Sequence, residues 1–176
     1  MTTVILVSGK AEHGKSLFAH YLTSKYESEG KKVLRVAFAK YLKFIAEEYY
    51  EWDGEKDEEG RELLQQVGTD TIRKREPNFW ADSLFALVEV LAPDFDYIIA
   101  DDCRFPNEVE VFKNSNLNTI AIRVIRLDYE NSLTNSQRLH PSETALDSHE
   151  FDYYVFAKDR ADLAKGVLSI STYFGL

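Results

Sequence analysis

Short apolar runs alternate with longer segments of mixed polarity along this chain of 176 residues. Five runs have the length and near-continuous apolar character of buried strands, and they lie at 4–7, 33–38, 97–100, 119–124 and 153–156. Between and after them, apolar residues recur at helical spacing over 15–29, 41–50, 61–72, 79–91, 107–114 and 162–173. Strands that alternate with helices predict a layered α/β domain with a mostly parallel sheet.

One long polar segment, 128–148, breaks this alternation. It contains Pro141 and several Asn, Ser and Thr residues, and it shows no sustained period. Loops of this length inside a compact domain are usually functional lids or disordered segments. We interpret this segment as a lid over a bound nucleotide, with disorder unrelated to function as the alternative.

A glycine-rich loop follows the first apolar run and precedes the first predicted helix. Its form is G-x-x-x-x-G-K-S, in which two glycines let backbone N–H groups converge on a nucleotide's phosphates. Lys15 is expected to reach the β- and γ-phosphates of ATP, and the Ser16 hydroxyl to ligate Mg²⁺. The residues expected to surround the phosphates are Gly9, Lys10, Ala11, Glu12, His13, Gly14, Lys15, Ser16 and Leu17.

A second polar group follows the strand at 97–100, where the sequence reads Asp101-Asp102-Cys103-Arg104. Ligands of open parallel sheets bind beyond the carboxyl ends of the strands. An acidic residue there can orient metal-bound water or an attacking oxygen, and a guanidinium can bridge phosphates. We therefore expect Asp102 and Arg104 to be functional, although helix capping and turn formation are an alternative.

Charge and composition narrow the class of partner. The net charge is -9, and seven of the surplus negative charges lie in 47–62, where nine acidic residues oppose two basic ones. We interpret this run as a solvated helix end and a loop. A duplex-binding protein would carry a basic stripe, so stable nucleic-acid binding is not expected, whereas small anionic substrates are compatible. The single cysteine and the absence of long apolar segments indicate a cytoplasmic protein without membrane spans.

Five blocks in a fixed order carry a family resemblance. They are GKAEHGKS, FAKYLK at 38–43, LLQQVGTD at 63–70 followed by Phe79-Trp80, DDCRFPNE at 101–108, and HPSE at 140–143. In this order they resemble the bacteriophage deoxynucleoside monophosphate kinases. The resemblance spans 4 to about 167, and it implies a single P-loop kinase domain over 1–176, in the host cytoplasm if the chain is phage-encoded.

The resemblance also implies an architecture and a reaction. The fold would be three-layered, with a five-stranded sheet, helices on both faces, a helical acceptor-binding region at about 40–92 and a lid at about 127–148. The enzyme would transfer the γ-phosphoryl group of ATP to a deoxynucleoside 5'-monophosphate. Longer family members carry an insertion between the second strand and LLQQVGTD that this chain lacks, so the acceptor base and formation of a homodimer remain open. The sequence also leaves open the choice between deoxyribose and ribose and between ATP and GTP as donor.

Roles follow from the same comparison. Lys15, Arg104 and Arg126, together with Mg²⁺, would neutralise the transferring group. Asp102 would orient metal-bound water or the acceptor oxygen, and Ser16 would share the metal. The acceptor residues would be Lys40, Lys43, Arg61, Gln66, Gly68, Thr69, Asp70, Trp80, Arg104, His140 and Glu143. Trp80 could equally pack in the core, and Arg73 is more readily explained by a solvated helix end.

Two other functions stay open at this point. One is a P-loop kinase for another acceptor, such as a hydroxymethylated pyrimidine in DNA, which the acidic composition disfavours. The other is a nucleotide-dependent switch, which would need loops that sense the γ-phosphate and a surface for a partner. Turnover that depends on an acceptor separates a kinase from a switch.

Overall fold

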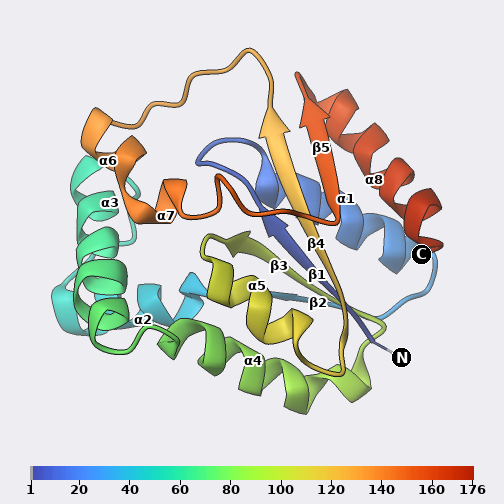
Figure 1. Ribbon diagram of the computed structural model, residues 1–176, viewed down its shortest axis with the longest axis horizontal. Coiled ribbons are helices and arrows are strands. Elements are labelled where there is room, and N and C mark those ends of the chain that lie inside the picture. The colour runs from blue at the N-terminus through green and yellow to red at the C-terminus, as the bar shows by residue number, and fades with distance from the viewer. Residues whose placement is uncertain (1) are drawn as a thin grey trace.

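A parallel sheet of five strands forms the centre of the molecule. The computed structural model describes residues 2–176. The strands are β1 (Thr3–Ser8), β2 (Val33–Val36), β3 (Tyr97–Cys103), β4 (Asn118–Arg126) and β5 (Tyr153–Ala157). Their order in the sheet is β2-β3-β1-β4-β5, and every neighbouring pair is parallel (Figure 1). The prediction of an α/β domain with a mostly parallel sheet is confirmed.

Helices cover both faces of this sheet. The α-helices are α1 (Lys15–Ser28), α2 (Ala39–Tyr50), α3 (Glu58–Gln65), α4 (Phe79–Leu91), α5 (Pro106–Lys113), α6 (Asn135–Leu139), α7 (Pro141–Thr144) and α8 (Arg160–Phe174). A π-helix, η1 (Gln66–Arg73), continues α3, and a 3₁₀-helix, η2 (Ala92–Asp94), follows α4. No helix within 2–176 combines the length and the apolar character needed to cross a bilayer.

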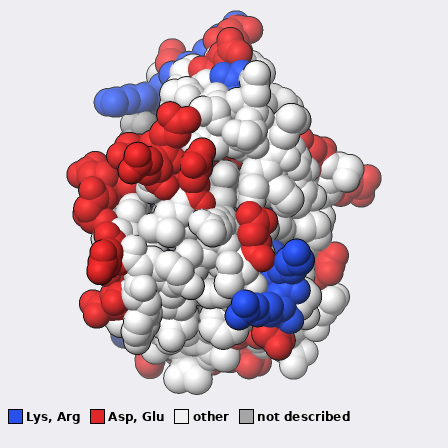
Figure 2. All heavy atoms as spheres, turned by 90° about the vertical axis from the view of Figure 1, so that its left-hand side faces the viewer, with Lys and Arg blue, Asp and Glu red and all other residues white. Residues whose placement is uncertain are grey.

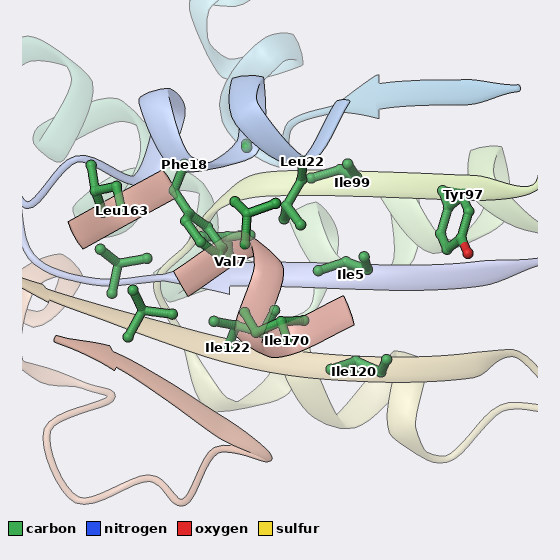
Figure 3. Close-up of a cluster of buried hydrophobic side chains, with 14 of the residues drawn as sticks. Ile5, Val7, Phe18, Leu22, Tyr97, Ile99, Ile120, Ile122, Leu163 and Ile170 are labelled. Carbon is green, nitrogen blue, oxygen red and sulfur yellow. The ribbon is translucent and has the colours of Figure 1, made fainter. Parts of the chain in front are cut away.

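Alternate residues of β1 supply the two halves of the core. Ile5 and Val7 face one cluster, which α1 and α8 cover with side chains such as Phe18 and Ile170 (Figure 3). Val4 and its neighbours on the same side of the strand belong to a second cluster beneath α4 and α5. Because β1 is buried on both faces, its sequence is apolar throughout, as is typical of a central parallel strand. The three-layer arrangement therefore holds β1 and the loop after it rigidly.

Three element boundaries differ from those predicted. β3 continues past Ala100 through Cys103, so the Asp101-Asp102 pair lies within the strand's last residues. The single helix predicted over 61–72 starts earlier, because Asp57 accepts a hydrogen bond from the Gly60 amide and caps α3, and it changes to π geometry at Gln66. β2 ends at Val36 because the following residues already enter α2.

The polar segment after β4 is more ordered than its lack of period indicated. It contains α6 and α7, and a capping box between Thr134 and Gln137 starts α6. His140 ends α6 and caps α7, since its side chain accepts a hydrogen bond from the Ser142 amide. Helices of four or five residues are too short to show a helical period, which explains why the segment resembled a loop.

Candidate active site

The glycine-rich loop lies at the carboxyl end of β1 and leads directly into α1. Gly9 has a φ of 147°, and a Cβ atom there would lie 2.4 Å from the Val124 carbonyl oxygen of β4. Only glycine fits this close approach between two backbones. Gly14 has a φ of 90° and forms the N-cap of α1. The two glycines thus turn the chain so that the positive end of α1 faces the loop, which is the arrangement that binds phosphate.

Lys15 is buried in this loop and points back onto it. Its Nζ donates a 2.7 Å hydrogen bond to the Lys10 carbonyl oxygen, and 7% of the residue is exposed. Burial, and after it the charge of the nearby Arg104 guanidinium, lower the pKa of Lys15 to about 7. An anion in the loop would restore the charge on this ammonium group.

Glu143 supplies a carboxylate to the same loop. Its Oε2 accepts a 2.8 Å hydrogen bond from the Ala11 amide, and its Oε1 accepts one from the Arg104 guanidinium. The carboxylate is 5% exposed, and it also acts on Lys15. The carboxylate of Glu143, a residue of α7, therefore already lies against the Ala11 amide of the loop. The loop thus forms an anion-binding site, and the Glu143 carboxylate occupies a position that a phosphate oxygen could take.

Asp102 holds the start of α2. Its two carboxylate oxygens accept 2.9 Å hydrogen bonds from the amides of Phe38 and Ala39, and burial raises its pKa. This is the capping role considered from the sequence, here toward a helix distant in the chain. Each carboxylate oxygen has a second lone pair, so the group can still accept from a metal-bound water.

The residues expected to hold Mg²⁺ fit that ion's chemistry in part. Ser16 is exposed in the first turn of α1, and its hydroxyl makes no hydrogen bond to any of the described residues. Mg²⁺ keeps several waters and takes few protein ligands, so one hydroxyl and one carboxylate reached through water suffice. No group of three or more His, Cys, Asp and Glu side chains within 2–176 could hold a metal by itself.

Arg104 is positioned by a buried carboxylate that the sequence did not single out. Glu108 accepts hydrogen bonds from the amides of Arg104 and Phe105, at 2.7 and 3.1 Å, and pairs with Arg73 at 2.5 Å. Burial raises the pKa of Glu108 to about 7, while Arg73 opposes that rise. The guanidinium of Arg73 also stacks over the Phe105 ring at 3.8 Å. The expectation that Arg73 lies at a solvated helix end is therefore wrong, because this ion pair buries it.

Glu12 links the loop to the segment after β4. Its carboxylate accepts hydrogen bonds from the Tyr129 hydroxyl at 2.7 Å and from the amide and hydroxyl of Ser132 at 3.0 and 2.5 Å. The Ser132 hydroxyl is the largest of the influences that lower the pKa of Glu12 to about 2. Arg61 of α3 lies 3.6 Å from the same carboxylate. The loop is thereby tied to both the predicted lid and the predicted acceptor region.

Arg126 lies beside the loop at the end of β4. Its guanidinium stacks over Tyr129 at 3.7 Å and donates to the Glu12 carbonyl oxygen at 3.4 Å, while its amide donates to His13 Nδ1 at 3.2 Å. Its side chain is exposed. The cation is thus held at the edge of the loop, close to where a triphosphate would lie.

Four basic side chains form a cationic group next to the loop: Lys43, Lys56, Arg61 and Arg104. Partial burial lowers the pKa of Lys56, and the charges of the other three lower it further. Lys56 was missed in the sequence because it is one of only two basic residues in the acidic run 47–62, where a solvated role was the simplest interpretation. Like charges repel, so this group favours an anionic ligand that would neutralise it.

The remaining predicted residues fall into three places. Gln66, Asp70 and His140 line a pocket between η1 and the α6–α7 segment. Gly68 and Trp80 are buried, and the Trp80 indole donates a 2.9 Å hydrogen bond to the Gly68 carbonyl oxygen, so the ring takes the core-packing role. The others lie at the margins: Lys10 pairs with Asp147, Leu17 packs on the core, Thr69 is half-buried, and Lys40 is exposed on α2.

Comparisons with known proteins give the fold. No family model matches the chain, and no curated protein matches it. Among solved structures, a sugar kinase from Janibacter sp. HTCC2649, unliganded, is similar with a TM-score of 0.60, 14% identity and coverage of 96% of this chain and 94% of that one. The APS kinase CysC of Mycobacterium tuberculosis in complex with AMPPNP and APS matches with a TM-score of 0.55, 7% identity and coverage of 99% and 98%.

A Cys556Ala mutant of the same APS kinase matches with a TM-score of 0.52, 10% identity and coverage of 97% of each chain. At these identities the likeness establishes the fold. The chain therefore has the fold of these kinases, and its own glycine-rich loop lies between β1 and α1.

Proposed function

We propose that this chain is a P-loop kinase that transfers the γ-phosphoryl group of ATP to a deoxynucleoside 5'-monophosphate. The observation that carries the proposal is the glycine-rich loop at the start of α1, with Lys15 buried in it and with Arg61 and Arg104 in contact with carboxylates beside it. A loop for one phosphate chain and a separate set of cations for another anion match two phosphorylated substrates. Solved structures of the same fold come from kinases, and one of them was determined with AMPPNP.

Arg104 connects the two anion sites. It contacts Glu143 at the loop, it is the strongest charge acting on Lys15, and it also acts on Lys56. A guanidinium between donor and acceptor can stabilise the charge that develops on the transferring group. Lys15 would bind the donor phosphates, and Arg126 at the loop's edge would add to the neutralisation.

The reaction requires positioning more than acid–base chemistry. An acceptor phosphate oxygen attacks the γ-phosphorus of ATP, the bond from that phosphorus to the β–γ bridging oxygen breaks, and ADP leaves. A phosphate acceptor is already ionised at neutral pH, so no side chain needs to remove a proton. Mg²⁺, held by Ser16 and by water oriented on Asp102, would neutralise charge on the donor phosphates when bound.

The surface supports a small acceptor rather than a polymer. Figure 2 looks onto the side of α3 and α6, and the face in view carries clusters of Asp and Glu with only separate groups of Lys and Arg. A DNA strand on this face would meet like charges instead of a basic stripe. A hydroxymethylated pyrimidine in DNA is therefore the less suitable acceptor.

A coupled assay with Mg-ATP and each common deoxynucleoside monophosphate tests the proposal, with the diphosphate product identified by anion exchange. Lys56→Ala should raise the KM for the monophosphate about tenfold, because a charge-assisted contact is lost, and should leave the KM for ATP nearly unchanged. Lys74→Ala, at an exposed lysine outside the cationic group, is the matched control.

Three outcomes would refute the assignment. If protein that binds ATP forms no diphosphate from any monophosphate, the acceptor class is wrong. If ATP is hydrolysed at a rate that no acceptor changes, the switch alternative is correct. Phosphorylation of hydroxymethylated DNA in preference to every free monophosphate would instead establish the polymeric acceptor.

A further inference from the structure

A polar pocket lies between the α3–η1 helix and the α6–α7 segment. Its volume is about 520 Å³, within the range of small-molecule sites. Its walls are hydrogen-bonding side chains, including Glu62, Gln65, Gln66, Asp70, Gln137 and His140. His140 caps α7, and Glu143 of the same short helix contacts Arg104 and the Ala11 amide of the loop. The pocket therefore adjoins the site proposed for the acceptor phosphate.

His140 presents a hydrogen-bond donor that has no partner. The Ser142 amide donates to its Nδ1 at 3.2 Å, so Nδ1 is an acceptor and the neutral ring carries its hydrogen on Nε2. Burial is the largest influence on the pKa of His140 and lowers it, which keeps the ring neutral at pH 7. Nε2 is buried and makes no hydrogen bond within 2–176. A buried donor of this kind is costly unless a ligand satisfies it, and because Nε2 is covered, the ring has to turn toward the pocket before a ligand oxygen can reach it.

Asp70 places two acceptors next to this donor. Its Oδ1 lies 4.0 Å from His140 Nε2, beyond hydrogen-bond distance, and its side chain is 65% exposed toward solvent. An ionised carboxylate can only accept. A ligand edge that reached both His140 Nε2 and the Asp70 carboxylate would therefore meet a row of one donor and two acceptors.

The Watson–Crick edge of guanine is the complement of this row. It offers the O6 acceptor, then the N1–H donor, then the N2 amino donor, so all three groups are satisfied. Adenine can pair with only one donor and one acceptor of the row. Thymine would place its O2 carbonyl against a carboxylate oxygen, and cytosine would present two acceptors to Asp70, both of which are repulsive.

We propose that this pocket binds the base of the acceptor nucleotide and selects guanine, with His140 reading O6 and Asp70 reading N1–H and the N2 amino group. The inference rests on the proposed function and names the substrate of that same site. It makes deoxyguanosine 5'-monophosphate the preferred acceptor. The side-chain amides of Gln65 and Gln66, which also line the pocket, would contact the rest of the base.

The first test compares kcat/KM for the monophosphates of deoxyguanosine, deoxyinosine, deoxyadenosine, deoxycytidine and thymidine. Deoxyguanosine monophosphate should be the best acceptor, and deoxyinosine monophosphate, which lacks only the N2 amino group, should be about tenfold poorer. Thymidine monophosphate performing as well as deoxyguanosine monophosphate would overturn the inference and leave the proposed function intact. Failure of all five acceptors would instead refute the proposed function.

The second test exchanges one acceptor for a donor. Asp70→Asn presents one carboxamide oxygen and one amino group, so with His140 the row becomes donor, acceptor, donor, which complements thymine. We expect kcat/KM for deoxyguanosine monophosphate to fall about tenfold and that for thymidine monophosphate to rise. Asp82→Asn, at an exposed aspartate of α4, is the control.

Calorimetric titration of the protein with each monophosphate in the absence of ATP measures affinity independently of turnover. The affinities should follow the same order as kcat/KM. In the Asp70→Asn variant, the affinity for deoxyguanosine monophosphate should fall and that for thymidine monophosphate should rise. An equal loss for all bases in a variant that melts like the wild type would show that Asp70 does not read the base, and would overturn the inference.

Discussion

Nucleotide binding at the loop should be coupled to uptake of a proton by Lys15, because the pKa of this side chain is low in the free protein. In the structure its ammonium group is buried, and its pKa is lowered to about 7. Phosphate oxygens beside Nζ would favour the charged form and raise that pKa again. At pH 8 a group with a pKa of 7 is about nine-tenths deprotonated, so binding should take up about 0.9 proton, against about 0.1 at pH 6.

The same linkage sets the pH dependence of affinity. Below pH 7 Lys15 is already charged, so affinity should be level there. Above pH 7 Lys15 must be protonated for the nucleotide to bind. This protonation costs about 1.4 kcal/mol per pH unit, so the Kd should rise about tenfold per unit. The rise ends when the pH passes the pKa of Lys15 in the complex.

Calorimetric titration with a non-hydrolysable ATP analogue in two buffers of different ionisation enthalpy measures the proton uptake. Lys15→Arg is the matched variant, since a guanidinium stays protonated throughout and should abolish the difference between pH 6 and pH 8. Equal uptake at both pH values by wild-type protein that binds the analogue would refute the reasoning, as would the same uptake in the Lys15→Arg variant.

Three further predictions concern carboxylates. Glu143→Gln should tighten binding of the ATP analogue several-fold in a fluorescence titration, since it removes a negative charge that lies beside the Ala11 amide and Lys15 and repels phosphate; weaker binding would contradict this. Asp102→Ala should lower the free energy of unfolding in urea by about 2 kcal/mol through loss of two bonds to the start of α2, and an unchanged midpoint would argue against a capping role. Glu108→Ala should cost about 3–5 kcal/mol in the same assay, and Arg73→Ala should add little in the double variant, whereas additive losses would exclude a coupled pair.

The sheet and the loop could be predicted from sequence because both depend on local patterns. A strand buried on two faces has a continuous apolar run, and 4–7 shows it plainly. The glycines at positions 9 and 14 mark a turn that other residues could not make. These signals are contained in a few neighbouring residues, so no knowledge of the tertiary structure is needed to detect them.

The site's connections could not be predicted in the same way. Glu108 lies in an amphipathic helix, and only the folded chain brings Arg73 to it from 35 residues away. Lys56 is surrounded by acidic residues in sequence, yet its neighbours in space are Lys43 and Arg104. A run of like charges in the sequence shows only the local composition, whereas a binding site depends on which side chains come together after folding.

The π-helix η1 determines which side chains of the acceptor region share one face. Its hydrogen bonds span five residues instead of four, so Gln65 and Asp70, which both line the pocket, are five positions apart. Each residue of an ordinary helix rotates the chain by about 100°. Five positions of an ordinary helix turn the chain by about 500°, so α geometry would leave Asp70 about 140° away from the face of Gln65. The π geometry of η1 thus lets Gln65 and Asp70 line one pocket although they are five positions apart.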